Sequence, residues 1–286
     1  MTHTALTSEQ NALYAALDWL AGQGVDCLLT DQPIDRTVLK IDRPALAAPV
    51  NGERTPRPEA LPKQAAFLGA SQAKAEAIKL AAAANSLEEL KAAIESFEGL
   101  AIKKTANSTV FSDGNPKAHI MLVGEAPGAE EDLQGKPFVG ESGQLLDKII
   151  AAIGISRASE RPEQGIYIAN ILNWRPPGNR TPSPEEVEVS LPFIERHIQL
   201  AAPKILILCG GVSAKALLGR NEGVSRLRKT WHEYRPLTPE ITASSAIQAL
   251  ATYHPSYLLR TPAQKKLVWS DMLEIAQKIA FNAKNM

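Results

Sequence analysis

The chain has 286 residues, of which 44% are apolar, 22% charged and 5% aromatic, and its formal net charge at pH 7 is zero. This apolar content excludes a wholly disordered chain. No apolar run reaches the roughly 18 residues of a membrane helix, and the first ten residues lack the features of a signal peptide, so we expect a cytoplasmic protein without a membrane span. A net charge of zero does not decide nucleic-acid binding, because the distribution of charge decides it.

The N-terminal third is predicted to be helical and interrupted by a linker. Residues 6–22 place apolar side chains on one helical face, which predicts a helical arm within residues 1–30. Residues 31–62 are rich in proline and form the expected linker. Residues 63–108 are predicted to be a helical segment of two helices, because Ser86 followed by Glu89 is typical of a new helix start.

From residue 109 to residue 282, short apolar runs alternate with helix-like segments, which predicts one α/β domain. The strand-like runs are 119–123, 166–172, 204–209 and 247–253, and the helix-like segments are 143–153, 184–201 and 213–218. This alternation favours a parallel sheet of about four strands that is flanked by helices. Sheets of this kind place their chemistry just past the carboxyl ends of the strands.

Polar and glycine residues follow each of the four predicted strands. The first strand is followed by Glu125 in a Gly/Pro turn, the second contains Asn170, the third ends at Gly210-Gly211, and the fourth is followed by His254. Taken singly, a strand asparagine is usually a buried structural amide and a histidine before proline is usually a surface or core residue. Because all four lie at one edge of the sheet, together they indicate a catalytic site.

Four segments that carry these residues resemble one enzyme family in their order, their spacing and their residue identities. They are GEAPGAEEDLQGKPFVGESGQLLD, IANILNWRPPGNRTP, GGVSAKALLG and YHPSYLLR, within about Val110 to Leu273. The chain resembles the bacterial iron–sulfur class (family 4) of uracil-DNA glycosylases. The resemblance implies a uracil-DNA glycosylase-like fold with a helical N-terminal extension. It also implies a monofunctional DNA glycosylase of base excision repair, which hydrolyses the N-glycosidic bond of flipped-out uracil and leaves an abasic site.

The uracil pocket needs a stacking surface and a means of telling uracil from cytosine. Phe138 matches the family's stacking aromatic residue. The Asn170 amide offers a donor and an acceptor that suit uracil and mismatch cytosine. Backbone N–H groups near Ala126 and Gly128 are expected to bind the edge of the base.

Cleavage produces a cationic sugar and a uracil anion, so it calls for a donor and a carboxylate. His254 matches the family's histidine that stabilises the anion. A carboxylate is needed to stabilise the sugar and to orient the attacking water, with Glu131 as the first candidate and Glu125 as the second. The resemblance does not decide between them.

DNA contacts are expected from basic residues and from an apolar pair near the same rim. Cations would hold phosphates, and the pair would enter the minor groove and fill the vacated stack. An ordinary solvated basic face is the alternative for the cations. The candidates are Arg175, Arg180, Arg226, Arg228, Lys229, Leu258, Leu259 and Arg260.

The chain departs from the family at its iron–sulfur cluster, which four cysteines hold. The matching positions carry Phe97, Leu100, Trp174 and Ser190. The whole sequence has two cysteines, Cys27 and Cys209, and a cluster of this type needs four thiolates. We therefore expect no cluster, no other metal and no cofactor, and the large apolar replacements suggest that the cluster's place is filled.

Three alternatives stay open at this point. The chain could be a non-catalytic DNA-binding repair partner, a glycosylase that accepts other deaminated bases such as hypoxanthine, or, least favoured, a nucleotide hydrolase. Some relatives carry a basic insert with a histidine and trap DNA covalently, but the WRPPGNRTP segment lacks this insert and predicts ordinary turnover. The expected partner is uracil-containing DNA, bound by a monomer. The sequence leaves the role of residues 1–95 and the preference for single or double strands undecided.

Overall fold

The computed structural model describes residues 63–228, 230–242 and 245–284, and within the helices at its two ends the side chains of 63–70 and 282–284 are not described. The predicted arm (1–30) and linker (31–62) lie outside the described residues, as does Lys229. None of the helices in the described part of the chain is long and apolar enough to cross a lipid bilayer.

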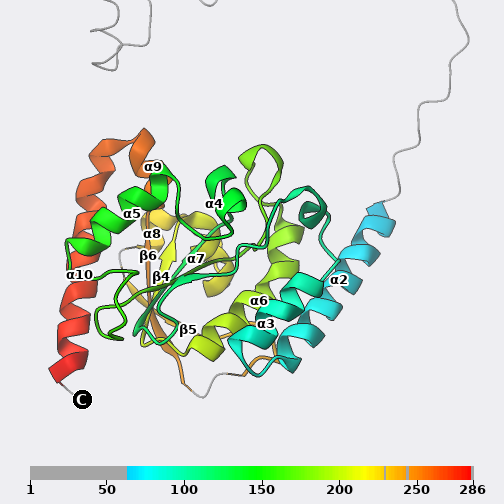
Figure 1. Ribbon diagram of the computed structural model, residues 1–286, viewed down its shortest axis with the longest axis horizontal. Coiled ribbons are helices and arrows are strands. Elements are labelled where there is room, and N and C mark those ends of the chain that lie inside the picture. The colour runs from blue at the N-terminus through cyan, green and yellow to red at the C-terminus, as the bar shows by residue number, and fades with distance from the viewer. Residues whose placement is uncertain (1–62, 229, 243–244, 285–286) are drawn as a thin grey trace, which may run out of the picture. The chain divides into compact units, whose positions relative to one another are not determined.

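A six-stranded sheet in the order β1-β3-β2-β4-β6-β5 forms the centre of the fold (Figure 1). Its central strands are parallel, namely β2 (Ile120–Gly124), β3 (Tyr167–Asn170), β4 (Ile205–Cys209) and β6 (Ile247–Thr252). These strands correspond to the four predicted apolar runs. The register pairs Gly124 with Asn170 and Cys209 with Thr252, so the strand ends lie at one edge of the sheet.

The sheet is mixed, which corrects the prediction of a purely parallel, about four-stranded sheet. β1 (Asp113–Gly114) pairs antiparallel with β3 at one edge, and β5 (Trp231–Tyr234) pairs antiparallel with β6 at the other. β1 has only two residues, and β5 has the sequence WHEY, without an apolar run. The sequence pattern missed both strands because edge strands need not be apolar on both faces.

Helices cover both faces of the sheet. The α-helices are α2 (Lys63–Ala83), α3 (Leu87–Ser96), α4 (Ala129–Gln134), α5 (Glu141–Ala151), α6 (Pro184–Ala201), α7 (Gly211–Leu218), α8 (Val224–Leu227), α9 (Pro255–Arg260) and α10 (Lys265–Lys284). Short 3-10 turns occur at η1 (Ala101–Thr105), η2 (Pro177–Asn179) and η3 (Pro262–Gln264). One buried cluster joins the sheet to α2, α3, α6 and α7, and a second joins it to α5, α9 and α10 (Figure 1).

The two predicted helices before the sheet are confirmed as α2 and α3. Ser86 Oγ accepts the N–H of Glu89 at 3.1 Å, and Glu89 Oε2 accepts the N–H of Asn85 at 2.7 Å, so the predicted cap starts α3. The Arg196 guanidinium donates to the carbonyl of Ala84 through Nε at 2.8 Å and Nη2 at 2.6 Å. These bonds fasten the end of α2 to α6.

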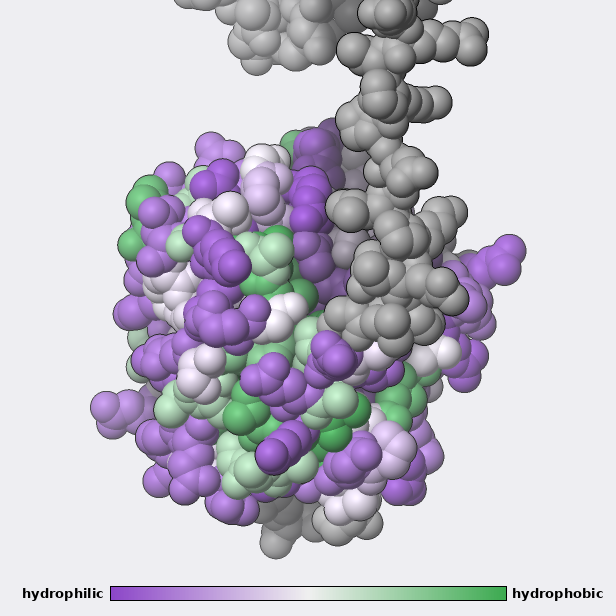
Figure 2. Space-filling model, turned by 90° about the vertical axis from the view of Figure 1, so that its right-hand side faces the viewer, coloured by the Kyte–Doolittle hydropathy of each residue, from purple (hydrophilic) through white to green (hydrophobic). Residues whose placement is uncertain are grey.

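On the face that Figure 2 shows, hydrophilic residues surround a smaller hydrophobic area. This is the right-hand side of Figure 1, where α2 lies. Along α2, Ala73, Ala77 and Ala81 are buried, whereas Glu76 and Lys79 are exposed. The helix therefore turns a narrow alanine stripe toward the core and charged side chains toward solvent.

Candidate functional site

A pocket of about 420 Å³ opens where the loops after β2, β3, β4 and β6 meet. The structure brings the candidate site residues of all four strands together in its wall. They are Glu125, Ala126, Gly128, Glu131, Phe138, Asn170, Gly210, Gly211 and His254, and Arg180 and Arg260 join them. The pocket therefore collects every residue proposed for catalysis and base binding.

Asn170, in the wall of this pocket, has a buried acceptor atom that is not used. It ends β3 and is 3% exposed, and its Oδ1 has no hydrogen-bond partner among the described residues. A Cβ on Gly124 would lie 2.4 Å from this oxygen and 2.7 Å from the Phe138 ring, so only glycine fits beside them. A buried polar atom without a partner is costly, which suits an atom that receives its donor from a ligand.

Phe138 adopts an unusual backbone conformation in the pocket wall. Its φ of 54° is left-handed, which costs a residue with a Cβ roughly 1–2 kcal/mol, and its side chain is 4% exposed. A Cβ on Gly143 would lie only 1.9 Å from the Phe138 carbonyl oxygen, so the first turn of α5 leaves space for this backbone. The surrounding structure must therefore hold the conformation in place.

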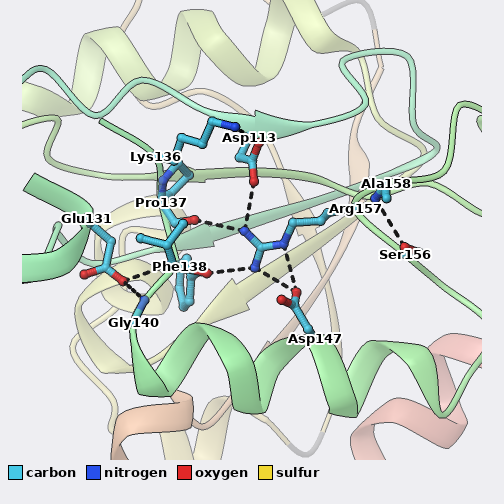
Figure 3. Close-up of polar contacts among 11 residues, drawn as sticks. Asp113, Glu131, Lys136, Pro137, Phe138, Gly140, Asp147, Ser156, Arg157 and Ala158 are labelled. Carbon is cyan, nitrogen blue, oxygen red and sulfur yellow. Dashed lines mark hydrogen bonds and ion pairs between the residues drawn. The ribbon is translucent and has the colours of Figure 1, made fainter. Parts of the chain in front are cut away.

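Glu131 is one of the groups that hold the backbone around Phe138 in place (Figure 3). Its Oε1 accepts the N–H groups of Val139 and Gly140, both at 3.0 Å, and its Oε2 accepts that of Gly128 at 3.1 Å. The residue is 8% exposed. Both carboxylate oxygens are thus engaged by backbone donors that link the start of α4 to the loop after Phe138.

Glu125 differs from Glu131 because its carboxylate lines the pocket without a hydrogen-bond partner among the described residues. Burial raises the pKa of this carboxyl above its ordinary value. A partly desolvated carboxylate with free oxygens is suited to accept a proton from water.

His254 is held as a neutral donor. Its Nδ1 accepts the backbone N–H of Ser256 at 3.2 Å, and because a backbone N–H can only donate, Nδ1 is unprotonated. Desolvation lowers the pKa of His254 to about 4, an effect that the charge of Glu131 opposes and that of Arg260 reinforces. Near pH 7 the ring is therefore neutral and carries its proton on Nε2.

Two of the expected DNA-contacting cations lie at the mouth of the pocket. Arg180 and Arg260 line it and are exposed. Arg180 also forms a bidentate pair with Glu186 at 2.8 and 2.6 Å, which orients its guanidinium. Arg175 donates to Asn179 Oδ1 at 2.6 Å, next to the same mouth.

Two of the residues expected to contact DNA, Arg228 and Leu258, are buried in the structure. Arg226, another of the expected contacts, is exposed. Arg228 is 8% exposed and donates to Asp271 through Nε at 3.1 Å and Nη2 at 2.6 Å, so it is an internal ion-pair partner and does not face phosphates. Leu258 of α9 is fully buried in the core, whereas its neighbour Leu259 is 43% exposed. Only Leu259 is thus available to a DNA stack.

The four residues expected at the family's cluster positions do not fit an iron–sulfur cluster. Phe97, Leu100 and Trp174 belong to the buried cluster under α2, α3 and α6, and Ser190 is 1% exposed. The Phe97 ring packs edge-on against Phe193 at 5.2 Å. Among the described residues, no group of three or more His, Cys, Asp or Glu side chains could hold a metal ion.

Arg157 lies beside the site but is not among the residues predicted from the sequence. It lies in the loop before β3, and its guanidinium contacts the carbonyls of Pro137 and Phe138 (Figure 3). No motif surrounds it, and its partners are distant in the sequence, so no local signal could have identified it.

Comparisons with known proteins agree with this geometry. The sequence model of the uracil DNA glycosylase superfamily matches residues 111–273. A type-4 uracil-DNA glycosylase of Pyrobaculum aerophilum is 35% identical over 181 residues, which are 62% of this chain and 86% of that protein. The type-4 enzyme of Archaeoglobus fulgidus is 33% identical over 67% of this chain and 92% of its own length.

A more distant relative extends the comparison to a second type of the same enzyme. The type-5 uracil-DNA glycosylase of Thermus thermophilus is 30% identical over 50% of this chain and 67% of that protein. The matched region of the superfamily covers more than half of the chain and contains every residue of the pocket wall. The chain therefore belongs to the uracil-DNA glycosylase superfamily.

Proposed function

We propose that this chain is a monofunctional uracil-DNA glycosylase that hydrolyses the N-glycosidic bond of flipped-out uracil and leaves an abasic site, a step of base excision repair. The names of its type-4 relatives support this activity. The observation that carries it is the buried Oδ1 of Asn170, which lies in the pocket wall without a partner among the described residues.

Uracil supplies the donor that this oxygen lacks. Its ring N3–H can donate to Asn170 Oδ1 while the amide nitrogen donates to the uracil O4 carbonyl. Cytosine has an amine and a bare nitrogen at these places, so both bonds would be lost. A site built on paired polar contacts can reject such an analogue by roughly 10⁴-fold.

Bond cleavage leaves electrons on the uracil ring, and His254 is placed to stabilise them. The C1′–N1 bond breaks with its electron pair moving to uracil, whose oxygens become negatively charged. The neutral His254 ring offers Nε2–H as a donor to one of these oxygens. The Ser256 N–H supports this tautomer through Nδ1.

Glu125 is the better candidate for the attacking water, which reverses the order expected from sequence. Glu131 uses both oxygens to accept three backbone N–H groups and acts as a positioning residue. The Glu125 carboxylate accepts the proton of a water whose oxygen bonds to C1′ of the cationic sugar. The immediate products are the abasic sugar, the uracil anion and protonated Glu125. Glu125 then returns its proton to solvent, and the released anion takes up a proton from solvent to give uracil.

The lining of the pocket supports a simple hydrolase. No lysine lines it, so among the described residues it offers no amine for the Schiff base that a lyase needs. Leu259, Arg180, Arg226 and Arg260 are proposed to contact the DNA around the extruded base.

We infer further that the enzyme works without the family's iron–sulfur cluster. Four thiolates cannot come from a chain with two cysteines, and the described one, Cys209, is buried in β4. The packing of Phe97 on Phe193 replaces the cluster with apolar contacts. No step of the proposed reaction involves a metal.

The test is excision of uracil from a labelled oligonucleotide, followed by alkaline cleavage of the abasic site. We expect activity from a protein without absorbance near 400 nm, and a loss on the order of 10²–10³-fold in Asn170→Ala. Asn173→Ala is the matched control, since Asn173 is also buried but bonds the Val110 carbonyl at 3.1 Å. DNA binding without excision would favour a non-catalytic repair partner. If an oligonucleotide that contains hypoxanthine is cleaved in preference to the uracil oligonucleotide, the chain is a glycosylase with a broader base range.

A further inference from the structure

We propose that Arg157 is a positioning residue of the uracil pocket, which holds the Phe138 ring in place by binding the backbone on its carbonyl side. The proposal rests on the proposed function, in which Phe138 stacks on the base. Arg157 is absent from the pocket wall, so any effect it has on the reaction passes through the loop that it binds.

The guanidinium of Arg157 binds two consecutive carbonyl groups (Figure 3). Nη1 donates to the Pro137 carbonyl at 3.1 Å, and Nη2 donates to the Phe138 carbonyl at 2.9 Å. The planar fork of an arginine makes two such bonds at once, which a lysine ammonium does not reproduce. The carbonyl side of the Phe138 residue is therefore fixed in direction as well as in position.

Two carboxylates fix the fork itself. Nε donates to Asp147 on α5 at 2.8 Å, and Nη1 donates to Asp113 on β1 at 3.0 Å. The Arg157 side chain is only 16% exposed. Because charge-assisted bonds in a partly buried place are strong and directional, the guanidinium links the loop to a strand and a helix of the framework.

Arg157 and Glu131 hold the Phe138 loop from opposite sides. Arg157 donates hydrogen bonds to the carbonyls of Pro137 and Phe138. Glu131 accepts hydrogen bonds from the N–H groups of Val139 and Gly140. Between the two groups lies the left-handed backbone of Phe138, which a free chain would leave for a more favourable conformation. With the carbonyl side released, the ring is expected to lose its place in the wall.

The experiment compares Arg157→Met with Arg157→Lys and with Arg161→Met, a control in which an exposed arginine loses its pair with Glu163. Single-turnover excision from a single-stranded uracil oligonucleotide is measured well below each melting temperature, together with the Kd for that DNA. Because a misplacement of about 1 Å can cost about 100-fold in rate, we expect Arg157→Met to lose between roughly tenfold and 100-fold. Kd should stay within about twofold, and Arg161→Met should match the wild type.

A spectroscopic measurement follows the ring directly. The Phe138 ring lies close enough to His254 to shift the NMR signals of the imidazole protons, so Arg157→Met should move these signals and Arg161→Met should not. Arg157→Lys should recover part of the rate. If Arg157→Met does not fold, Arg157→Lys carries the same comparison against Arg161→Met.

The proposal is overturned if Arg157→Met melts earlier yet excises at the wild-type rate while folded, or if the His254 signals do not move. A wild-type protein that excises nothing would instead refute the proposed function. The NMR comparison would then still decide whether Arg157 sets the position of the Phe138 ring.

Discussion

The ring of Phe138 lies 5.2 Å from the imidazole of His254, centroid to centroid, and the two planes are inclined by 31°. The proposed stacking surface for the base and the proposed donor for its negative charge are therefore in mutual contact. They come from loops after different strands, so their relative position depends on the register of the central sheet. This contact makes the pocket sensitive to changes on either loop.

The rate of excision is expected to fall on acidification as Glu125 takes up a proton. Burial raises the pKa of this carboxyl above 4.5, and only the carboxylate can accept a proton from water. Since the pKa of His254 is about 4, that ring stays neutral through this fall. Glu125→Gln should lose on the order of 10²–10⁴-fold in single-turnover rate and the pH dependence above pH 4.5. An unchanged profile in that variant would show that another group titrates.

Glu131→Gln should damage the fold in a way that Glu125→Gln does not. A glutamine has one acceptor oxygen where Glu131 serves three N–H groups, so at least one buried donor loses its partner. We expect a loss of about 1–3 kcal/mol in the free energy of unfolding, measured with urea. Glu125→Gln, which breaks no hydrogen bond, serves as the control. Equal stability of the two variants would contradict the positioning role.

The neighbours Leu258 and Leu259 should separate stability from DNA binding. Leu258→Ala opens a cavity in the core and should cost about 2–5 kcal/mol. Leu259→Ala lies at the surface and should change stability by less than about 0.5 kcal/mol. If Leu259 fills the vacated stack, this second variant excises more slowly from duplex than from single-stranded DNA. If the Leu259→Ala variant is equally active on duplex and single-stranded DNA, Leu259 does not fill the vacated stack.

Acid should destabilise the protein through His197. Its ring stacks on Phe111 at 4.3 Å and bonds the Tyr167 hydroxyl at 2.8 Å, and burial lowers its pKa to about 3. Between about pH 6 and 4 the unfolded chain binds a proton at this residue and the folded chain does not. Stability therefore falls by about 1.4 kcal/mol per pH unit on acidification because of His197 alone. In His197→Gln the slope of unfolding free energy against pH should decrease by this amount, and an unchanged slope would argue against a buried neutral ring.

The aromatic packing of Phe97, a residue expected at one of the family's cluster positions, should carry stability. Phe97→Ala removes a fully buried ring from its contact with Phe193 and should cost about 3–5 kcal/mol. Leu133→Ala, at a side chain that is 70% exposed, is the control and should be nearly neutral. Iron chelators should leave the melting temperature of the wild type unchanged. A chelator-sensitive protein would overturn the inference of a cluster-free fold.

The central strands and several helices could be predicted from sequence because their pattern is local. The run ILILC is buried along its whole length as β4, and α6 begins after its cap at Ser183 and spans the predicted residues. β5 has no such pattern, since it reads WHEY and lies at an edge. Its pairing with β6 depends on contacts that no short window of sequence contains.

The site residues also divide into those that a local sequence pattern predicts and those that depend on distant contacts. Asn170 and His254 could be expected to lie close together, because the carboxyl ends of parallel strands meet at one edge of a sheet. Both line the pocket. Arg228 and Leu258 were misjudged because a basic run and an apolar pair look alike whether they face solvent or the core. The partner of Arg228 is Asp271, far along the chain on α10, and this pairing decides its burial.

The pocket has a consequence for how the protein is made. Its wall starts at Glu125 and is complete only with Arg260, and its strands join neighbours that are distant in sequence. A chain emerging from the ribosome can form α2, α3 and their local contacts early, but it has no base-binding site until α9 has been synthesised. Uracil excision is therefore a property of the nearly finished domain, and a nascent or prematurely terminated chain that lacks α9 has no activity on DNA.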